Sequence, residues 1–471
     1  MPAAPVRPVI TIVGGGFAGT ALALALARQP GRLDADIYLL EPSPAPGPGL
    51  AYAPQPPEYL LNVRAGAMSV AADEPTHFAV WLAAQPESAA GTPPEFAPRA
   101  TYGRYLRQTL AAVLDQPPPN GSRLRWLPQA ATAAPTGPTG ARLVQLADGQ
   151  QLMSDYVVLA LGNFPPPPPA GPDLTYLTHP RYHANPWAPA LPARIGPDES
   201  VLLIGSGLTA VDVVLGLRAA GHRGLITVVG RHGRWPAAHG PVTAAYPSFY
   251  PELAGLTSVV AVLRVLRRHV RQAAARGLDW RPVLDALRPD TGRIWAAWPP
   301  SEQARFLRHL ASWWAALRHR SPAPNAAAIA ALQASGVVRP HVGRVSEVLP
   351  DRDELRVRIR PGEDPRAWLR AQHVVCCTGP LLDYHHIGTP LVESLRASGD
   401  LTPDPLGLGL LTDPHGALLS AAGTVSCALF TLGASRRPAY FESTAAPELR
   451  QQAAALALEL TRRIQSAKPS V

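Results

Sequence analysis

The sequence of 471 residues has little cysteine, a single lysine and few long apolar runs. Its three cysteines, Cys376, Cys377 and Cys427, form no CxxC motif, which argues against a disulfide framework, a zinc site and a dithiol redox centre. Apart from the stretch 9–27, no segment approaches the ~18 apolar residues of a membrane-spanning helix. We therefore expect a cytoplasmic protein with no metal and no membrane partner.

The positive charge comes almost entirely from arginine, because Lys468 is the one lysine among 43 basic residues. The formal net charge is +9, and 55 prolines accompany the bias toward arginine. Nucleic-acid binders place basic residues beside aromatic ones or in a recognisable reader motif, and neither pattern is present. Anionic nucleotide cofactors explain a surplus of cations equally well. No nucleic-acid partner is therefore expected. The chain length and a hydrophobic content of 46% allow about two or three domains, each with a buried core.

The stretch 9–27 predicts a buried strand, a tight glycine turn and a helix of small residues, which is a dinucleotide fingerprint. The first glycine permits the turn, the second leaves room for a pyrophosphate, and the third lets the helix pack closely on the strand. Three consecutive glycines and the lack of a basic start argue against a signal peptide. A second strand ends in an acid, 22 residues after the third glycine, where it can hold a ribose hydroxyl. The residues expected at this site are Gly14, Gly16, Phe17, Ala18, Gly19 and Glu41.

The next segments predict further parts of the first domain. Residues 47–82 are rich in loops, and we expect them to lie over the cofactor, although an ordinary connecting excursion is the alternative. A helix is predicted over 99–114, followed by a small β element over 124–133 and 141–152 with a hairpin turn at Asp148-Gly149. A strand then ends in a corner at Gly162, and five prolines, 165–169, mark the exit from the domain.

A second fingerprint opens at Val201, with Gly205, Gly207 and Ala210 in the three glycine roles. The strand that follows ends in Arg231, in the place of the acid of the first fingerprint, and an arginine there suits a 2′-phosphate. NADPH is therefore favoured over NADH. A second strand-to-glycine corner ends at Gly379, so the two corners flank this unit, as expected if it is inserted into the first.

Residues 241–330 show helical periodicity over 259–277 and 301–320, and five of the ten tryptophans lie between 280 and 314. We expect a helical insertion. Both nucleotide units can be built without it, so it is the expected place for a substrate site. The cluster Arg318, His319 and Arg320 is the candidate for contact with an anionic cofactor or substrate, and capping of a helix dipole is the alternative. A final helix is predicted with Thr444 as its N-cap.

The predicted fold class is α/β, with two Rossmann-like dinucleotide-binding domains, the second inserted in the first, and a helical insertion. The expected domains are 1–169 with 371–471 for the first unit, 196–240 with 331–370 for the second, and 241–330 for the insertion. This order resembles the two-dinucleotide-binding flavoproteins. The motifs GGGFAG, GLAYAPQPPEYLLNVRAGAMS, IGSGLTAVD, DWRPVLDALRP, FLRHLASWW and YFESTAAPELR are similar to a bacterial family of FAD/NAD(P)-binding proteins. That family includes FAD-dependent urate hydroxylases and aspartate N-oxidising, nitrosuccinate-forming monooxygenases.

The resemblance implies that FAD binds the first unit and NADPH, or NADH, the second. It places Asn62 and Met68 beside the flavin. It also directs the start of the final helix, Ser443, Thr444 and Ala445, at the flavin pyrimidine edge. For the nicotinamide nucleotide it implies Gly205, Gly207, Thr209 and Arg231. The FxGxxxH string of class B monooxygenases is absent between the two units.

Three functions are compatible with these features. The first is a monooxygenase that uses NADPH and molecular oxygen to hydroxylate a small nitrogenous substrate, such as a purine, an amino acid or an amine, through a flavin C4a-(hydro)peroxide. The second is a reductase or electron-transfer flavoprotein without oxygen insertion. The third is a non-catalytic flavin-binding sensor, which would leave the second fingerprint without a use.

Overall fold

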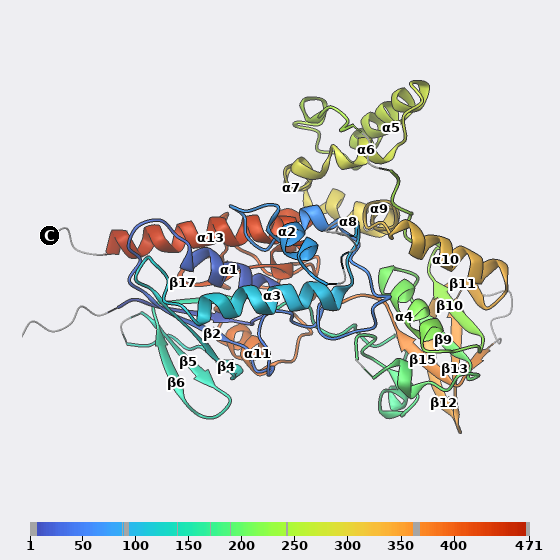
Figure 1. Cartoon of the computed structure of the whole chain (residues 1–471), viewed down its shortest axis with the longest axis horizontal. Helices are drawn as coiled ribbons and strands as arrows, with labels where there is room; N and C mark the ends of the chain where they lie inside the picture. The colour runs from blue at the N-terminus through green and yellow to red at the C-terminus, as the bar shows by residue number, and fades with distance from the viewer. Residues whose placement is uncertain are drawn as a thin grey trace, which may run out of the picture. The chain divides into compact units, whose positions relative to one another are not determined.

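The computed structural model describes residues 7–86, 88, 94–138, 140–169, 171–188, 190–241, 244–360 and 368–467 (Figure 1). The chain divides into two compact units. Unit 1 comprises Met1–Ala53, Val63–Phe164 and Leu382–Val471, and unit 2 comprises Pro54–Asn62 and Pro165–Leu381. Unit 2 is thus inserted into unit 1, as the two glycine corners predict.

Unit 1 is built on a six-stranded sheet with the order β16-β17-β7-β1-β2-β3. All neighbouring pairs are parallel except β16 with β17. The central strands are apolar on both faces because helices cover them, which is typical of a parallel sheet. The strands are β1 (Val9–Val13), β2 (Asp36–Leu40), β3 (Arg123–Leu127), β7 (Tyr156–Leu159), β16 (Ala417–Leu419) and β17 (Val425–Thr431).

Two helices of unit 1 run side by side although they come from opposite ends of the chain (Figure 1). Helix α1 (Phe17–Ala27) packs against α13 (Ala446–Ala467), and ten of its eleven residues are buried. This explains why α1 consists almost entirely of small and apolar residues. The other helices are α2 (His77–Ala83), α3 (Arg99–Leu114), α11 (Pro390–Ala397) and α12 (Arg437–Tyr440).

The small β element of unit 1 differs in one strand from its prediction. Strands β4 (Ala131–Ala133), β5 (Arg142–Leu146) and β6 (Gln151–Ser154) form an antiparallel sheet, and the predicted turn joins β5 to β6, with Gly149 at φ 88°. Strand β3, expected in this element, instead lies beside β2 in the main sheet, with Asp36 opposite Arg123. The alternation of apolar and polar residues in β3 predicts a strand but not the strand with which it pairs, because the pairing depends on residues that are distant in the sequence.

Unit 2 contains a five-stranded parallel sheet with the order β11-β10-β9-β15-β8. A separate antiparallel sheet has the order β12-β13-β14. The strands of the parallel sheet are β8 (Tyr182–His183), β9 (Val201–Ile204), β10 (Ile226–Gly230), β11 (Val338–Val342) and β15 (His373–Cys376). Those of the other sheet are β12 (Arg344–Asp351), β13 (Glu354–Arg360) and β14 (Trp368–Ala371).

The borders between the units lie at different residues from those expected. The chain leaves unit 1 at Phe164 rather than after 169, and it returns at Leu382 rather than 371. The later return is explained by β15, which pairs with β9 so that Val374 lies opposite Leu202. We assigned this strand to the first domain, but it belongs to the sheet of unit 2.

A short segment of the early chain, Pro54–Asn62, also belongs to unit 2. Its Tyr59 is buried and lies against Gly216 of α4 (Leu208–Ala219), where a Cβ would come within 2.6 Å of the phenol ring. The ring also makes an edge contact with Trp187, with 6.2 Å between centroids. The glycine on α4 thus makes room for a side chain that anchors this excursion.

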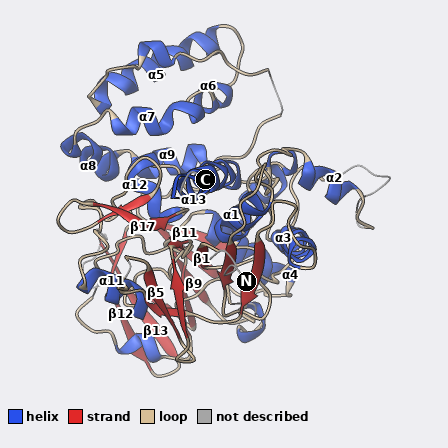
Figure 2. Ribbon diagram, turned by 90° about the vertical axis from the view of Figure 1, so that its left-hand side faces the viewer, coloured by secondary structure: helices blue, strands red, loops and turns tan. Residues whose placement is uncertain are grey.

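Between β10 and α10, the described residues of unit 2 form helices and loops without a strand, and we call this part the helical segment (Figure 2). It contains α5 (Val259–Ala275), α6 (Arg281–Asp285), α7 (Thr291–Ala296), α8 (Pro300–His309) and α9 (Ala311–Arg318). The single helix predicted over 301–320 is broken at Leu310, which has φ −120° and ψ −22°. No described helix is long and apolar enough to cross a membrane.

Helix α10 (Ala323–Ala334) is not part of this segment, although we expected the insertion to extend to 330. It packs on α4, and its Ile329 shares a buried core with Val211 and Val228. It leads directly into β11, which pairs with β10. Helix α10 is therefore the helix that connects the helical segment to β11 of the unit 2 sheet.

Candidate functional site

The first fingerprint forms the turn between β1 and α1. Gly14 has φ 106°, and a Cβ there would lie 2.3 Å from the Ala160 carbonyl oxygen. The Gly14 N–H donates to the Leu40 carbonyl and the Ala160 N–H donates to the Val13 carbonyl, both at 2.8 Å. The turn is thus held between the ends of β2 and β7, on the two sides of β1, where the strand order reverses. In open α/β sheets this is the place where ligands bind.

The third glycine is required by close packing of the helix on its own turn. A Cβ on Gly19 would lie 1.9 Å from the Gly14 carbonyl oxygen, far inside any real contact. In unit 2 the corresponding position is occupied by Ala210, which is fully buried. The alanine that the sequence places there is therefore accommodated.

Glu41 follows β2 at the same edge of the sheet, and its carboxylate is fixed by backbone groups. Oε2 accepts from the Gly15 N–H at 2.8 Å, and Oε1 accepts from the Ser43 N–H at 3.0 Å. A carboxylate has about four acceptor positions, so both oxygens can accept further hydrogen bonds. The side chain is half-buried. Its place and acceptor capacity suit the hydroxyls of a ribose.

The start of α1 fits an anionic group. No side-chain hydrogen bond caps this helix, and its first turn contains no acidic residue, so the helix dipole there favours a negative group. Gly16 faces Gly49, and a Cβ on Gly16 would lie 3.5 Å from the Gly49 Cα and 4.0 Å from its nitrogen. The Gly47 N–H donates to the Gly15 carbonyl at 2.7 Å, which holds this loop beside the turn. The loop at Gly47 and Gly49 therefore lies directly against the start of α1. Gly49 is a residue that the sequence analysis did not single out.

Unit 2 repeats this turn closely. Gly205 has φ 112°, and a Cβ there would lie 2.5 Å from the Cys377 carbonyl oxygen. The Gly205 N–H donates to the Val229 carbonyl and the Cys377 N–H donates to the Ile204 carbonyl, both at 2.8 Å. The start of α4 again lacks a side-chain cap and an acidic first turn. The two turns are therefore equivalent.

The glycine corners after the crossover strands are also equivalent. Gly162 follows β7 with φ 69°, and Gly379 follows β15 with φ 91°. Each corner glycine comes three residues after the last residue of its strand. Both corners lie at the carboxyl edge of their sheets, beside the fingerprint turns.

The two units differ in the residue that follows the second strand of the fingerprint, β2 in unit 1 and β10 in unit 2. Arg231 follows β10 and is exposed, in the place that Glu41 has after β2. A Cβ on Gly230 would lie 2.5 Å from the Ser206 Oγ, so this strand ends in a glycine to admit that hydroxyl. Thr209 lies half-buried in the first turn of α4. Cations thus stand where the first unit has an acid.

The structure brings together two of the elements predicted to face the flavin. Met68 is buried, and its carbonyl accepts from the Tyr102 hydroxyl at 2.7 Å. Arg450, in the second turn of α13, donates to the carbonyls on either side of Met68, those of Ala67 at 3.3 Å and Ser69 at 3.2 Å. Met68 is thereby tied to the start of α13. Asn62 belongs to unit 2, where its carbonyl accepts from His239 Nε2 at 3.0 Å.

The start of α13 lies close to the predicted position. The helix begins at Ala446, so Ala445 precedes it directly, rather than the predicted cap Thr444. Ser443 is buried and donates from Oγ to the Gly433 carbonyl at 2.6 Å. Gly433 follows β17 and lies against α1, where a Cβ would be 3.5 Å from the Ala18 Cβ. The loop before α13 is therefore anchored beside the first fingerprint helix, through a glycine that the sequence analysis did not predict.

The three residues of the basic cluster at the end of α9 have different surroundings. Arg320 is 4% exposed and forms two hydrogen bonds with the Asp285 carboxylate, at 2.9 and 3.0 Å. Its Nε also donates to the Leu317 carbonyl at 3.0 Å. This guanidinium joins the end of α9 to α6. Arg318 lies in the last turn of α9, and His319 follows it.

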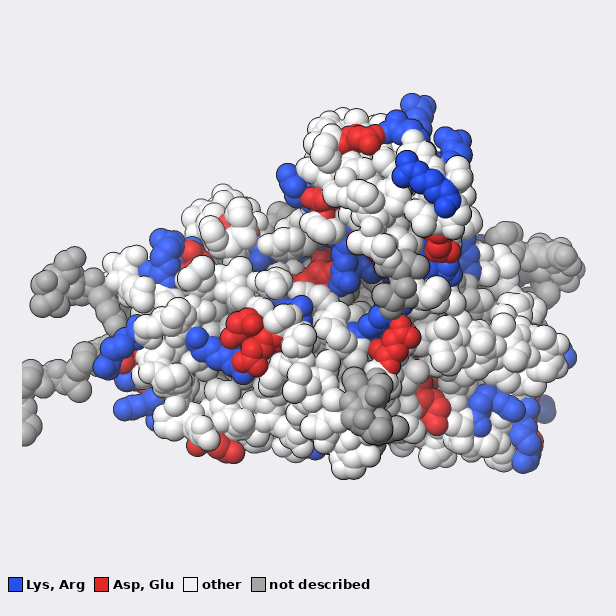
Figure 3. Space-filling model, turned by 45° about the horizontal axis from the view of Figure 1, so that its top comes forward, with Lys and Arg blue, Asp and Glu red and all other residues white. Residues whose placement is uncertain are grey.

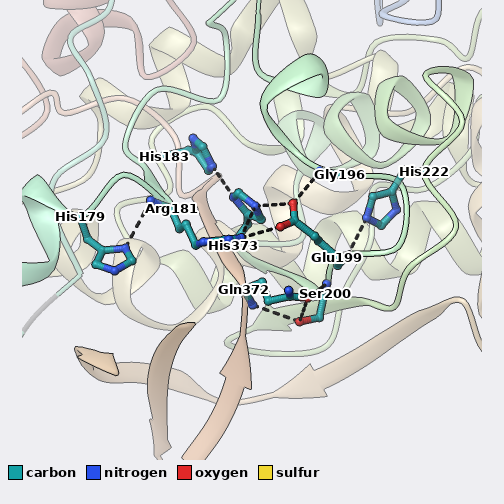
Figure 4. Close-up of polar contacts among 9 residues, drawn as sticks. All are labelled: His179, Arg181, His183, Gly196, Glu199, Ser200, His222, Gln372 and His373. Carbon is teal, nitrogen blue, oxygen red and sulfur yellow. Dashed lines mark hydrogen bonds and ion pairs between the residues drawn. The ribbon is translucent and has the colours of Figure 1, made fainter. Parts of the chain in front are cut away.

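A buried polar cluster lies at the opposite, amino edge of the unit 2 sheet (Figure 4). His373, at the start of β15, lies 2.8 Å from Glu199 Oε2 through its Nε2 and 2.9 Å from His183 Nε2 through its Nδ1. Arg181 donates to Glu199 at 2.7 Å. Burial lowers the pKa of His183 to about 4, and the hydrogen bond from Arg181 lowers the pKa of Glu199 to about 2. The imidazoles crowded into 178–187 are the only sequence signal of this cluster.

Charge is uneven in unit 2. Helix α5 carries four arginines and no acidic residue, and Figure 3 shows basic side chains gathered on the helical segment. In the part of the chain that the structure describes, no group of three or more His, Cys, Asp or Glu side chains could hold a metal ion.

Comparison with known proteins agrees with this geometry. Residues 11–164 match the model of a family described as FAD-NAD(P)-binding. No curated protein sequence matches the chain. The fold is similar to that of an ornithine N-hydroxylase from Kutzneria sp. 744, with 15% identity, a TM-score of 0.64 and coverage of 98% of this chain and 100% of that one.

Two further solved structures have similar folds. The L-lysine 6-monooxygenase from Pseudomonas syringae shows 19% identity and a TM-score of 0.65, over 97% of this chain and 100% of that one. The cadaverine monooxygenase of desferrioxamine biosynthesis from Erwinia amylovora, solved with FAD, shows 15% identity and a TM-score of 0.66, over 98% and 95%. These similarities confirm the predicted α/β fold class.

Proposed function

We propose that the protein is an FAD-dependent, NADPH-consuming monooxygenase that hydroxylates a small nitrogenous substrate. The observation that carries this proposal is the pair of equivalent turns at Gly14 and Gly205, each at the carboxyl edge of its own parallel sheet. The ribose-side strand ends in Glu41 in one unit and in Arg231 in the other. An acid there suits the free ribose of FAD, and an arginine suits the 2′-phosphate of NADPH.

FAD is assigned to unit 1. The turn from Gly14 to Gly19 and the uncapped start of α1 would hold the pyrophosphate, and Glu41 would bind the adenosine ribose. Met68 and the start of α13 would lie beside the ring, where the positive end of the helix favours negative charge on the flavin pyrimidine edge. When bound, FAD supplies hydride acceptance from NADPH and the activation of molecular oxygen.

NADPH is assigned to unit 2. The turn at Gly205 and Gly207, with Thr209 in the first turn of α4, would bind its pyrophosphate. Arg231 would pair with its 2′-phosphate. The first turn of α4 contains no acidic residue that would repel the phosphates.

The substrate is proposed to be an amine or an amino acid. The solved proteins of similar fold are named for acting on ornithine, lysine and cadaverine, each of which presents an amine. The urate-type and aspartate-type reactions implied by the family resemblance belong to the same proposal. Arg318 and His319 are the candidates for substrate contact, whereas the pairing of Arg320 with Asp285 gives that residue a structural role.

The experiment is a measurement of NADPH oxidation by the flavin-loaded protein, with and without oxygen, over a panel of ornithine, lysine, cadaverine, aspartate and urate. A monooxygenase consumes NADPH and oxygen in equal amounts with one panel member and forms a product that contains an atom of labelled oxygen. Equal rates with a quinone in the absence of oxygen, and no labelled product, would favour the reductase instead. Lack of any bound flavin after reconstitution would overturn the proposal.

A further inference from the structure

One arginine of unit 2 is stacked on a tryptophan of the helical segment, next to the second nucleotide turn. The Arg234 guanidinium lies over the Trp313 ring, with 3.6 Å from Cζ to the ring centroid. It also donates from one terminal nitrogen to the Ser312 hydroxyl at 3.1 Å. Trp313 nevertheless stays 49% exposed. Exposure of so large an apolar ring, in a stacked pair beside a binding turn, points to a ligand that covers it.

Hydrogen bonds to the backbone hold the segments that carry Arg234 and Trp313. On the side of the turn, the Ser206 hydroxyl donates to the Arg234 carbonyl at 2.6 Å. On the side of α9, the Ala237 N–H donates to the Ala316 carbonyl at 2.8 Å, one helical turn after Trp313. The stretch of chain that carries Arg234 is thus fixed at both ends. The pair is preorganised rather than a chance contact of two long side chains.

The charge of the pair has no acidic partner among the residues that the structure describes. Among the described residues, no acidic side chain pairs with Arg234 or with Arg231, which is exposed three residues earlier. In unit 1 the corresponding position carries Glu41, which is fixed by the turn itself. A cation stacked on an exposed ring, with a second cation three residues before it in the chain, matches a ligand with an aromatic base and a phosphate.

We propose that Trp313 and Arg234 form a platform on which the adenine of NADPH stacks, with the 2′-phosphate directed to Arg231. Planar guanidinium groups and indole rings both stack on the faces of aromatic bases, and this stacking does not depend on the hydrogen-bonding groups at the edge of the base. The inference rests on the proposed function, because it requires unit 2 to bind NADPH. It adds that the helical segment supplies one wall of the cofactor site through α9.

The test is calorimetric binding of two fragments, 2′,5′-ADP and 5′-AMP, to the purified full chain. Trp313→Ala should weaken both fragments about 10-fold, since loss of one base stack typically costs that much. Trp313→Phe should restore most of the binding. Arg231→Ala should weaken only 2′,5′-ADP. Trp368, which lies on the separate sheet with Arg356 and Arg358 each 5.3 Å from its ring, provides a matched control, and Trp368→Ala should change neither affinity.

The outcomes separate this inference from the proposed function. If the wild type binds 2′,5′-ADP and Trp313→Ala binds both fragments as well as the wild type, the platform is refuted while the NADPH assignment stands. A failure of the wild type to bind 2′,5′-ADP and NADPH would overturn the NADPH assignment itself. A Trp313→Phe variant that stays as weak as Trp313→Ala would also refute stacking, because a phenyl ring retains it.

Discussion

Substitution of Gly207 by alanine should separate nucleotide binding from folding. Gly207 has φ −83° and ψ −170°, an extended conformation open to any residue, and a Cβ there would meet no atom within 4 Å. Alanine lowers the conformational entropy of the unfolded chain, which stabilises the folded protein by about 0.4–1 kcal/mol. It is also a poorer N-cap than glycine, which destabilises the folded protein by a similar amount. The free energy of unfolding should therefore change by less than about 1 kcal/mol.

The binding of NADPH should nevertheless be lost, because the new methyl group fills the space through which the pyrophosphate approaches the backbone. We expect the dissociation constant to rise at least about 10-fold, or about 1.4 kcal/mol. Gly205→Ala provides the contrast. Its φ of 112° and the 2.5 Å approach to the Cys377 carbonyl combine backbone strain with overpacking. That variant should be destabilised by about 2–5 kcal/mol.

The assay combines urea unfolding with titration of NADPH, and FAD content serves as the control for unit 1, which neither substitution touches. Gly207→Ala should unfold like the wild type, retain its flavin and bind NADPH weakly. A Gly207→Ala protein that binds NADPH with unchanged affinity would refute the assignment of this turn to the pyrophosphate.

Three further predictions follow from the structure. Burial lowers the pKa of His183 to about 4 and also lowers the pKa of His373, so the unfolded chain binds more protons than the folded one below an ordinary pKa of about 6.5. Stability should thus be complete above pH ~6.5 and fall as the pH drops toward 4, and urea unfolding over this range should show a shallower loss for His183→Asn. Arg142 binds Asp400 through two hydrogen bonds of 2.8 and 2.9 Å, so Arg142→Met should destabilise the protein by about 2–4 kcal/mol, and a double-mutant cycle with Asp400→Asn that finds no coupling would contradict this. Arg231→Ala should weaken NADPH about 10- to 100-fold and leave NADH nearly unchanged, since a charge-assisted contact contributes roughly 1.5–3 kcal/mol, and equal losses for both nucleotides would assign Arg231 a structural role.

The geometry of the two glycine turns could be predicted from the sequence because its constraints are local. Gly14 and Gly205 need a positive φ and lie against a neighbouring strand, and both requirements follow from the residues of one strand, one turn and one helix. The corners at Gly162 and Gly379 repeat the same short pattern. Glu41 is fixed by the N–H of the adjacent turn, so its position after the strand suffices to place it.

The sequence did not predict the features that depend on distant partners. Strand β15 resembles β7 in sequence, but it pairs with β9, and only the pairing shows to which unit it belongs. Tyr59 anchors its segment to unit 2 through a glycine more than 150 positions away, which no local pattern records. Arg320 was grouped with Arg318 because they are neighbours in the chain, whereas Asp285, which decides its role, lies on another helix.

The most direct test of the central claim is an anaerobic titration of the flavin-loaded protein with NADPH, followed by its visible absorbance. If unit 1 holds FAD and unit 2 delivers NADPH to it, one equivalent of NADPH should bleach the flavin, and admission of air should restore the oxidised spectrum. A flavin that dithionite bleaches but that neither NADPH nor NADH reduces would contradict the account.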